Sequence, residues 1–187
     1  SAVRRNTACR ALWKQYFYLQ NKFSNVHQDF KVPNLIIIGS QKSGTTSLHN
    51  YLSQHPDIFM SHFKEPGYFL ESTDSPTLNT SRKRLRLGLD DAALLKLINL
   101  GHSDETWIGE SSTYYSMFPF LGAEAPENIA LRSPNARVIY IVRHPLERIV
   151  SQYLWGEKNE FALGSFHEVL EKRFEVMVSI SSYATQI

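Results

Sequence analysis

The feature that most constrains the fold of this chain is a short apolar run followed by a glycine-bounded loop and a helix. Leu35–Ile38 is apolar throughout and is closed by Gly39, which is typical of a strand buried on both faces of a sheet. After the loop, Thr45–Gln54 carries apolar side chains at helical spacing and stops before His55-Pro56. Strand, loop and helix in this order predict the opening βα unit of an open parallel sheet.

The rest of the chain repeats the alternation of strands and helices. Two further strands are predicted, at Thr106–Gly109 and Arg137–Val142. Ser165 and Glu168 have the spacing of a capping box, which predicts that a helix begins there. Apolar side chains at helical spacing predict three more helices, at Asp90–Leu100, Glu124–Leu131 and Leu146–Trp155.

Two segments do not fit this alternation. Residues 1–31 carry apolar side chains at helical spacing, so we predict an N-terminal helical lead-in before a domain at residues 32–187. The stretch Glu71–Gly88 has weak periodicity and many Ser, Thr and Asn residues, which indicates a surface excursion. Because Ser181–Ile187 has the character of a helix start, we expect the domain to be incomplete at its C-terminus.

The composition of the 187 residues is that of one globular domain, with 42% hydrophobic and 20% charged residues. The net charge of +2 hides local basic clusters that suit an anionic partner, and it does not indicate nucleic-acid binding. No apolar run approaches the roughly 18 residues of a membrane helix. The single cysteine, Cys9, excludes an internal disulfide. The absence of a membrane helix and of a disulfide favours a cytoplasmic location. A trimmed luminal domain from the Golgi is the alternative.

The loop Gly39–Thr46, with the sequence GSQKSGTT, has the features of an anion cradle, because its backbone N–H groups and the positive helix end would surround a phosphate. Gly39 and Gly44 meet the glycine spacing of ATP-binding P-loops, but Thr45-Thr46 stand where a Lys-Ser/Thr pair should follow. The lysine lies inside the loop instead, at Lys42. We therefore predict an α/β fold, a P-loop-like three-layer sandwich with a central parallel sheet and helices on both faces.

Lys42 can reach the oxygen that bridges a phosphate and a sulfonate, where it would neutralise the charge that develops as the S–O bond breaks. Without a magnesium-binding hydroxyl after a P-loop lysine, and without a clear acidic partner for that metal, a metal-free reaction is favoured. A glycine turn that binds nothing explains the loop equally well when the loop is taken alone. A second anion-binding site elsewhere in the sequence is therefore required to decide between these two explanations.

That second site is predicted at Arg143–Ser151, which reads RHPLERIVS. The strand before it delivers Arg143 at its carboxyl end, where open α/β sheets bind ligands. Pro145 suits the first turn of a helix, and Ser151 lies about two turns along it. An arginine fork and a hydroxyl suit a phosphate monoester. Taken alone, Arg143 and Arg148 would instead be ordinary surface salt-bridge partners.

The two motifs resemble those of the sulfotransferases that depend on 3′-phosphoadenosine-5′-phosphosulfate (PAPS), in particular the glycosaminoglycan-type and bacterial branch. Gln41–Leu48 resembles the family's 5′-phosphosulfate loop and Arg143–Tyr153 its 3′-phosphate site, within a resemblance that runs from Asn34 to Phe174. It implies that PAPS is the co-substrate and that Arg143 and Ser151 hold its 3′-phosphate. The residues implied to hold its 5′ end are Gln41, Lys42, Ser43, Gly44, Thr45, Thr46 and Ser47.

Lys64–Phe69, with the sequence KEPGYF, resembles the element of that branch that carries the proposed catalytic base. The resemblance assigns this role to Glu65, beside Lys42 as the second catalytic residue. Cytosolic small-molecule sulfotransferases use a histidine in a different motif, which has no match in this sequence. By composition alone Glu65 is a solvated loop residue, so its assignment rests on the resemblance.

Glu110–Tyr115, with the sequence ESSTYY, resembles the family's Glu-Lys-[ST]-Pro-x-Tyr segment, but Ser111 replaces the lysine and Thr113 the proline. That lysine lies near the acceptor in the glycosaminoglycan enzymes, so its absence argues against a polyanionic sugar. Glu110 is either a second acidic group of the active site or a structural hydrogen-bond acceptor. The candidate acceptor-site residues are Glu110, Tyr68 and Tyr114.

The resemblance implies transfer of a sulfonate from PAPS to an acceptor hydroxyl or amine by in-line displacement, with release of adenosine 3′,5′-bisphosphate. The acceptor is left open among a carbohydrate, a lipid, a small metabolite and an acyl chain tethered to a carrier. Two other functions remain as alternatives. One is a P-loop nucleotide kinase or other NTPase, and the other is a non-catalytic nucleotide-binding module.

Overall fold

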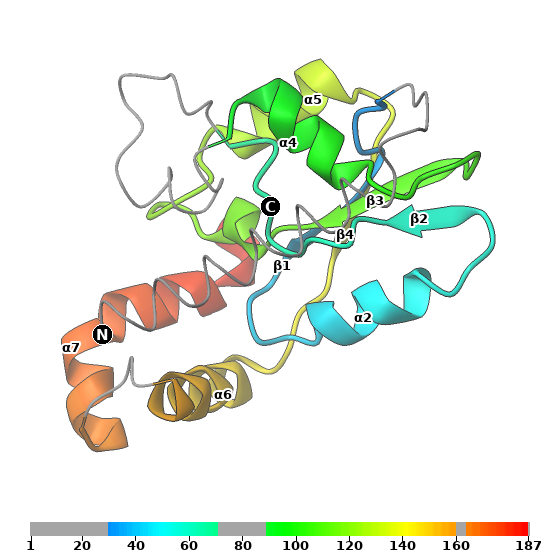
Figure 1. The fold of residues 1–187 in the computed structure, drawn as a ribbon. Coiled ribbons are helices and arrows are strands. Elements are labelled where there is room, and N and C mark those ends of the chain that lie inside the picture. Colours follow the sequence, from blue (N-terminus) through cyan, green and yellow to red (C-terminus); the bar gives the residue numbers. More distant parts are fainter. Residues whose placement is uncertain (1–29, 71–88, 160–163, 187) are drawn as a thin grey trace.

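A parallel sheet of four strands forms the centre of the computed structural model, which describes residues 30–70, 89–159 and 164–186 (Figure 1). The strands are β1 (Leu35–Gly39), β2 (Ile58–Met60), β3 (Trp107–Ser111) and β4 (Arg137–Tyr140), in the order β2-β3-β1-β4. Leu35 of β1 pairs with Gly109 of β3 on one side and with Arg137 of β4 on the other. The predicted residues 1–29 of the lead-in and the predicted excursion at 71–88 lie outside the described ranges.

Helices cover both faces of this sheet. Figure 1 shows α4 and α5 on one side of the strands and α2 on the other. Ile36 packs in one apolar core with residues of α4 and α5, whereas Ile37 packs in a second core with residues of α2. The predicted three-layer α/β sandwich is confirmed. Within the described ranges, the helices of eight or more residues are α2 (Thr45–Leu52), α4 (Asp91–Ile98), α5 (Ala125–Arg132), α6 (Pro145–Lys158) and α7 (Phe166–Ser181).

Two of the helix starts form as the sequence predicts. At α4 the carboxylate of Asp90 accepts a hydrogen bond of 2.7 Å from the N–H of Ala93. At α7 the predicted capping box is present, because Ser165 Oγ accepts from the N–H of Glu168 and Glu168 Oε2 accepts from the N–H of Ser165. A short helical element at Thr113–Ser116 (η1) was not predicted, whereas the one at Tyr183–Thr185 (η2) lies where a helix start was expected.

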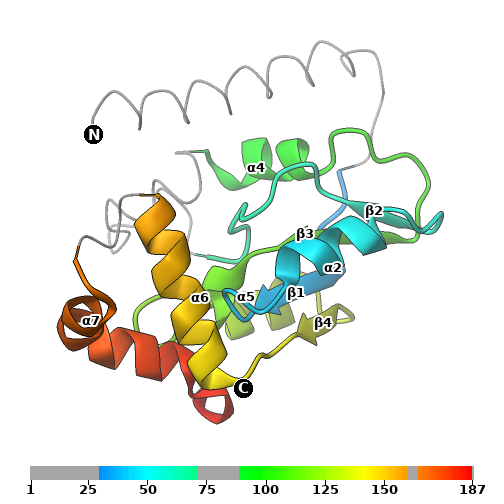
Figure 2. The same cartoon turned by 90° about the horizontal axis from the view of Figure 1, so that it is seen from below.

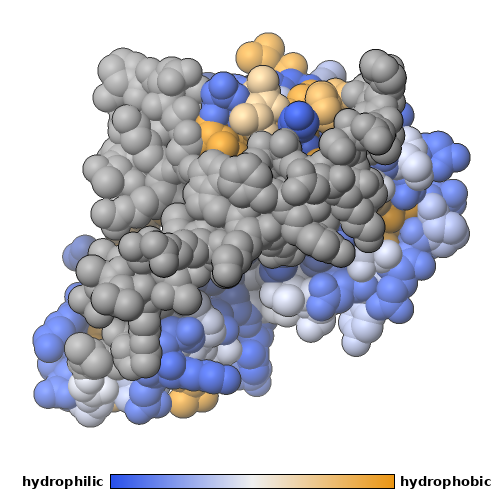
Figure 3. Space-filling view, in the orientation of Figure 1, coloured by the Kyte–Doolittle hydropathy of each residue, from blue (hydrophilic) through white to orange (hydrophobic). Residues whose placement is uncertain are grey.

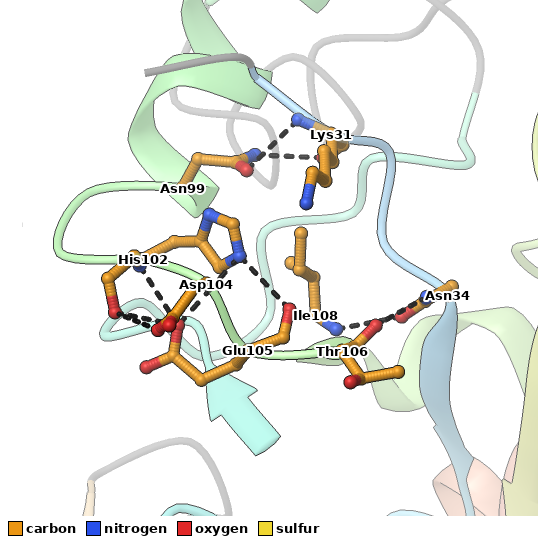
Figure 4. A network of polar contacts seen from close by, with 9 residues as sticks. Lys31, Asn34, Asn99, His102, Asp104, Glu105, Thr106 and Ile108 are labelled. Carbon is orange, nitrogen blue, oxygen red and sulfur yellow. Dashed lines mark hydrogen bonds and ion pairs between the residues drawn. The ribbon is translucent and has the colours of Figure 1, made fainter. Parts of the chain in front are cut away.

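Two asparagine side chains fix the chain where it enters β1 (Figure 4). Asn99, just after α4, accepts from the N–H of Lys31 at 3.1 Å and donates to the carbonyl of Lys31 at 2.9 Å. Asn34 accepts from the N–H of Ile108 at 2.7 Å and donates to the carbonyl of Thr106 at 3.1 Å. The Asn99 amide therefore joins the chain before β1 to the end of α4, and the Asn34 amide joins the start of β1 to β3.

Helix α6, which carries the predicted second anion site, is held by α7 rather than by the sheet alone (Figure 2). The side chain of Ile149 packs with Val169 and Met177 of α7. Arg148 is fully buried, and its guanidinium donates to Ser181 Oγ at 2.6 Å and to the Met177 carbonyl at 3.0 Å. The interpretation of Arg148 as a surface salt-bridge residue is therefore wrong.

The surface is mostly hydrophilic where Figure 3 shows described residues, with an apolar area over α4 and α5. On α6 itself, Leu146 is 67% exposed, whereas Ile149 is 8% exposed. The two side chains have the same number of carbon atoms and lie on one helix. They therefore form a matched pair for measuring how strongly α6 is docked.

We predict that Ile149→Ala lowers the free energy of unfolding by about 2–4 kcal/mol, because it removes buried carbon atoms and leaves a cavity between α6 and α7. Leu146→Ala removes as many carbon atoms from an exposed position and should change the free energy of unfolding by less than about 0.5 kcal/mol. Urea denaturation of both variants measures the difference. Equal effects would show that α6 is not docked through this contact.

Candidate active site

A cavity of about 410 Å³ lies where the carboxyl ends of the strands meet. Each strand leads into part of its wall, as expected for an open parallel sheet. The loop after β1, the segment after β2, the start of η1 after β3, and α6 after β4 all contribute. The lining residues are Gln41, Lys42, Gly44, Thr45, Thr46, Lys64, Glu65, Thr113, Tyr114, Ser151 and Trp155.

The loop between β1 and α2 is a tight turn that requires its glycines. Gly39 has a φ of 146°, and a methyl group there would collide with Ser116 Oγ. Lys42 and Gly44 also have positive φ, of 68° and 96°. Gly44 is the N-cap of α2 and supplies no side-chain cap, and no acidic residue lies in the first turn of that helix. The first N–H groups of α2 therefore face the cavity without a side-chain acceptor from the cap.

Lys42 lies inside the cavity against an aromatic ring. Its Nζ is 5.5 Å from the centroid of the Trp155 ring, within the range of a cation–π contact. Burial, assisted by the nearby charge of Arg143, lowers the pKa of Lys42. Arg143 itself forms an ion pair of 3.0 Å with Glu147, and its carbonyl accepts from Tyr183 Oη at 2.7 Å.

Glu65 is held in the cavity wall by the chain that follows β3. Its Oε2 accepts from the N–H of Thr113 at 2.7 Å and from Thr113 Oγ1 at 3.2 Å. The N–H of Glu65 donates to the Ser111 carbonyl at 2.7 Å. Burial raises the pKa of Glu65, against the opposing effects of the Thr113 N–H and of the Lys64 charge. A partly desolvated carboxylate in a cavity has the character of a proton acceptor.

Comparison with known proteins identifies the family of this chain. Residues 33–177 match the sulfotransferase family. The chain belongs to the sulfotransferase family. A crystal structure of a sulfotransferase from Alicyclobacillus acidocaldarius superposes with a TM-score of 0.70 at 30% identity, over 83% of this chain and 66% of that one.

Curated relatives of this sulfotransferase include human carbohydrate sulfotransferase 15, 23% identical over 78% of this chain, and a membrane-associated sulfotransferase of Dictyostelium discoideum, 32% identical over 69%. Human bifunctional heparan sulfate N-deacetylase/N-sulfotransferase 1 is 26% identical over 75% of this chain. The matches span 31%, 25% and 15% of the lengths of these three relatives. Among the described helices of this sulfotransferase, none is long and apolar enough to cross a membrane.

Most of the donor-site residues predicted for this sulfotransferase come together in the cavity. Those that line it are Gln41, Lys42, Gly44, Thr45, Thr46 and Ser151. Ser43, Ser47 and Arg143 are not among the lining residues, although Arg143 is close enough to influence the pKa of Lys42. Within the described ranges, no group of three or more His, Cys, Asp or Glu residues could hold a metal ion.

The three acceptor-site candidates are separated. Tyr114 lines the cavity, whereas Tyr68 and Glu110 are not among the lining residues. Tyr68 is buried and its ring packs edge-on against Phe69. Glu110 is fully buried and accepts hydrogen bonds from Tyr115 Oη and, at 2.7 Å, from Ser112 Oγ. This arrangement matches the alternative in which Glu110 is a structural acceptor.

Glu110 organises the segment that carries Glu65. Ser112 Oγ, which donates to Glu110, accepts from the N–H of Gly67 at 2.9 Å. Tyr115 Oη, which also donates to Glu110, accepts from the N–H of Phe69 at 3.0 Å. Through these two hydroxyls, the buried carboxyl group of Glu110 fixes the backbone at Gly67 and Phe69, two and four residues after Glu65.

Sequence reasoning missed three residues of the cavity wall, Lys64, Thr113 and Trp155. Trp155 lies four residues after Ser151, and this helical spacing, which places both on one face of α6, was an available signal. Lys64 Nζ donates to Thr46 Oγ1 at 2.7 Å, a contact between residues 18 apart. Its signal in the sequence was its place as the first residue of the KEPGYF element, directly before Glu65.

We predict that Glu110 makes the stability of the sulfotransferase depend on pH. Burial raises its pKa from 4.5 to about 7, so folding takes up a proton between these values and stability falls as pH rises through them. A shift of this size corresponds to about 3 kcal/mol. Glu110→Gln cannot ionise, so the wild type should lose about 3 kcal/mol relative to this variant across that window.

Urea denaturation at several pH values measures this difference, and groups common to both proteins cancel. Parallel curves for the wild type and Glu110→Gln would show that the carboxyl group does not change its protonation on folding.

Proposed function

We propose that this chain transfers a sulfonate from PAPS to a hydroxyl or amine of a carbohydrate acceptor and releases adenosine 3′,5′-bisphosphate. The observation that carries the proposal is one cavity lined by Lys42 of the β1 loop, Ser151 of α6 and Glu65. A carbohydrate acceptor is supported by the names of two relatives, carbohydrate sulfotransferase 15 and heparan sulfate N-deacetylase/N-sulfotransferase 1.

In the proposed mechanism the loop N–H groups and the α2 N-terminus bind the 5′-phosphosulfate. Lys42 leaves the Trp155 ring and donates to the bridging oxygen, where negative charge develops as the S–O bond breaks. Arg143 exchanges its exposed ion pair with Glu147 for the 3′-phosphate, to which Ser151 also donates. Each of these residues therefore contacts a phosphate group that is still present in the product, adenosine 3′,5′-bisphosphate.

Glu65 acts as the general base in this proposal. Its Oε2 stays bonded to Thr113, while Oε1, which has no partner among the described residues, takes the proton of the acceptor. A carboxyl group with a raised pKa is a stronger base than an ordinary glutamate, and the cavity keeps it near the transferred group. Tyr114 and Trp155 offer aromatic surface on which a sugar ring can pack.

We predict that adenosine 3′,5′-bisphosphate raises the melting temperature of the protein and that ATP with magnesium does not, since Lys42 lies inside the loop and Thr45 stands at the P-loop lysine position. Arg143→Met should weaken bisphosphate binding about 10–100-fold, because it removes charged hydrogen bonds to the 3′-phosphate. Arg137→Met, at an exposed position on β4, is the matched control.

A thermal-shift series and isothermal titration measure these affinities. Stabilisation by ATP with magnesium alone would favour the NTPase alternative. Binding of the bisphosphate without sulfonate transfer to any acceptor would favour the non-catalytic module.

We predict that Glu65→Gln reduces sulfonate transfer at least about 100-fold, because the amide cannot accept the proton, while bisphosphate affinity changes little. Transfer of labelled sulfonate from PAPS to a panel of carbohydrates, lipids, small metabolites and carrier-tethered acyl chains measures the rate. Glu127→Gln, exposed on α5, is the control for the same chemical change. Unimpaired transfer by Glu65→Gln would remove Glu65 from the role of base.

A further inference from the structure

A second cation, Lys64, lines the cavity beside the loop between β1 and α2, residues 39–46, which we call the phosphate loop. It lies in the segment after β2, directly before Glu65, and its ammonium is partly buried. The Nζ of Lys64 donates to Thr46 Oγ1 at 2.7 Å, and Thr46 lies in the first turn of α2. The charge of Lys64 is thereby held at the positive end of that helix.

This position is unfavourable for a lysine unless an anion is bound. The helix N-terminus carries a partial positive charge, and burial lowers the pKa of Lys64, against the opposing effect of the Glu65 charge. Among the described residues, Lys64 forms no ion pair, and its one hydrogen-bond acceptor is the neutral Thr46 hydroxyl. The adjacent Glu65 gives its Oε2 to Thr113 instead. A single neutral hydrogen bond does not offset the desolvation of an ammonium group.

We propose that Lys64 is a further catalytic residue, whose ammonium binds the oxygens of the sulfonate while it is transferred. The inference rests on the proposed function, since it places the sulfonate between the phosphate loop and Glu65. Lys42 and Lys64 then have different tasks. Lys42 binds the bridging oxygen of the leaving group, and Lys64 binds the group that moves.

The chemical step balances without any further reactant. The acceptor oxygen forms a bond to sulfur as the bond from sulfur to the bridging oxygen breaks, and that electron pair goes to the phosphate oxygen beside Lys42. The acceptor proton passes to Glu65. Lys64 neither gains nor loses a proton, and it lowers the barrier by holding positive charge against the sulfonate oxygens.

The position of Lys64 also explains how the cavity functions with Ser111 in place of a lysine. Ser111 Oγ lies 2.8 Å from Nδ1 of His49, and both side chains are buried. Burial, assisted by the charge of Lys64, lowers the pKa of His49 to about 4, so this histidine is neutral at pH 7. Position 111 therefore supplies no cation, and Lys64 supplies one from the neighbouring segment.

The test uses Lys64→Met, Lys64→Arg and, as a matched control, Lys96→Met at an exposed position on α4. We expect Lys64→Met to lower kcat at least about 100-fold, as for the loss of one preorganised charge donor. Its affinity for adenosine 3′,5′-bisphosphate, which lacks the sulfonate, should change less than about threefold. Lys64→Arg should recover part of the rate, and Lys96→Met should match the wild type.

The outcomes separate the two proposals. Wild-type protein that fails to bind the bisphosphate contradicts the proposed function itself. If the wild type binds it and transfers sulfonate, then an unchanged kcat in Lys64→Met overturns the role of Lys64. An equal loss of bisphosphate affinity and kcat in Lys64→Met also overturns it, because Lys64 would then support the loop rather than the sulfonate. The melting temperature of each variant shows whether it is folded.

Discussion

Strand β1 pairs with β3 along one side and with β4 along the other, and its side chains Ile36 and Ile37 enter apolar cores on opposite faces of the sheet. A strand buried in this way can reach solvent only at its ends. The two interior strands and their neighbours all run in the same direction, so their carboxyl ends meet at one edge. Every group of the candidate active site is carried by a segment that leaves the sheet at this edge.

The parts of the structure that depend on local sequence were predictable. The strand at Leu35–Gly39, its loop, and the helix starts at Asp90 and Ser165 follow from neighbouring residues, and they formed as expected. Strand β2 was missed because three residues give too short a pattern to recognise. The contacts of Glu65–Phe69 with Ser112–Tyr115 join residues 45 to 48 apart, and no local pattern encodes them.

The acids Glu110 and Glu65 differ in their exposure to solvent. Glu110 is fully buried and accepts hydrogen bonds from two hydroxyls, so it affects the stability of the fold. Glu65 keeps one carboxylate oxygen bonded and lines the cavity, so its raised pKa is available for chemistry. Through Ser112 and Tyr115 the first acid sets the backbone that presents the second. A residue that the sequence suggested for the acceptor site thus contributes by supporting the proposed base.

The chain that leaves β1 and the chain that leaves β4 are tied together beyond the sheet. The N–H of Ser40 donates to the Ile141 carbonyl at 2.6 Å, and the N–H of Ile141 donates to the Gly39 carbonyl at 2.8 Å. These bonds fix the spacing between the phosphate loop and the start of α6. Ile141 lies two residues before Arg143, and α6 begins two residues after it. The sheet therefore fixes the distance between the two segments that the proposed donor would join, one at each of its anionic groups. In the proposed function, a ligand with a single phosphate would contact the β1 loop alone and leave the start of α6 without an anion.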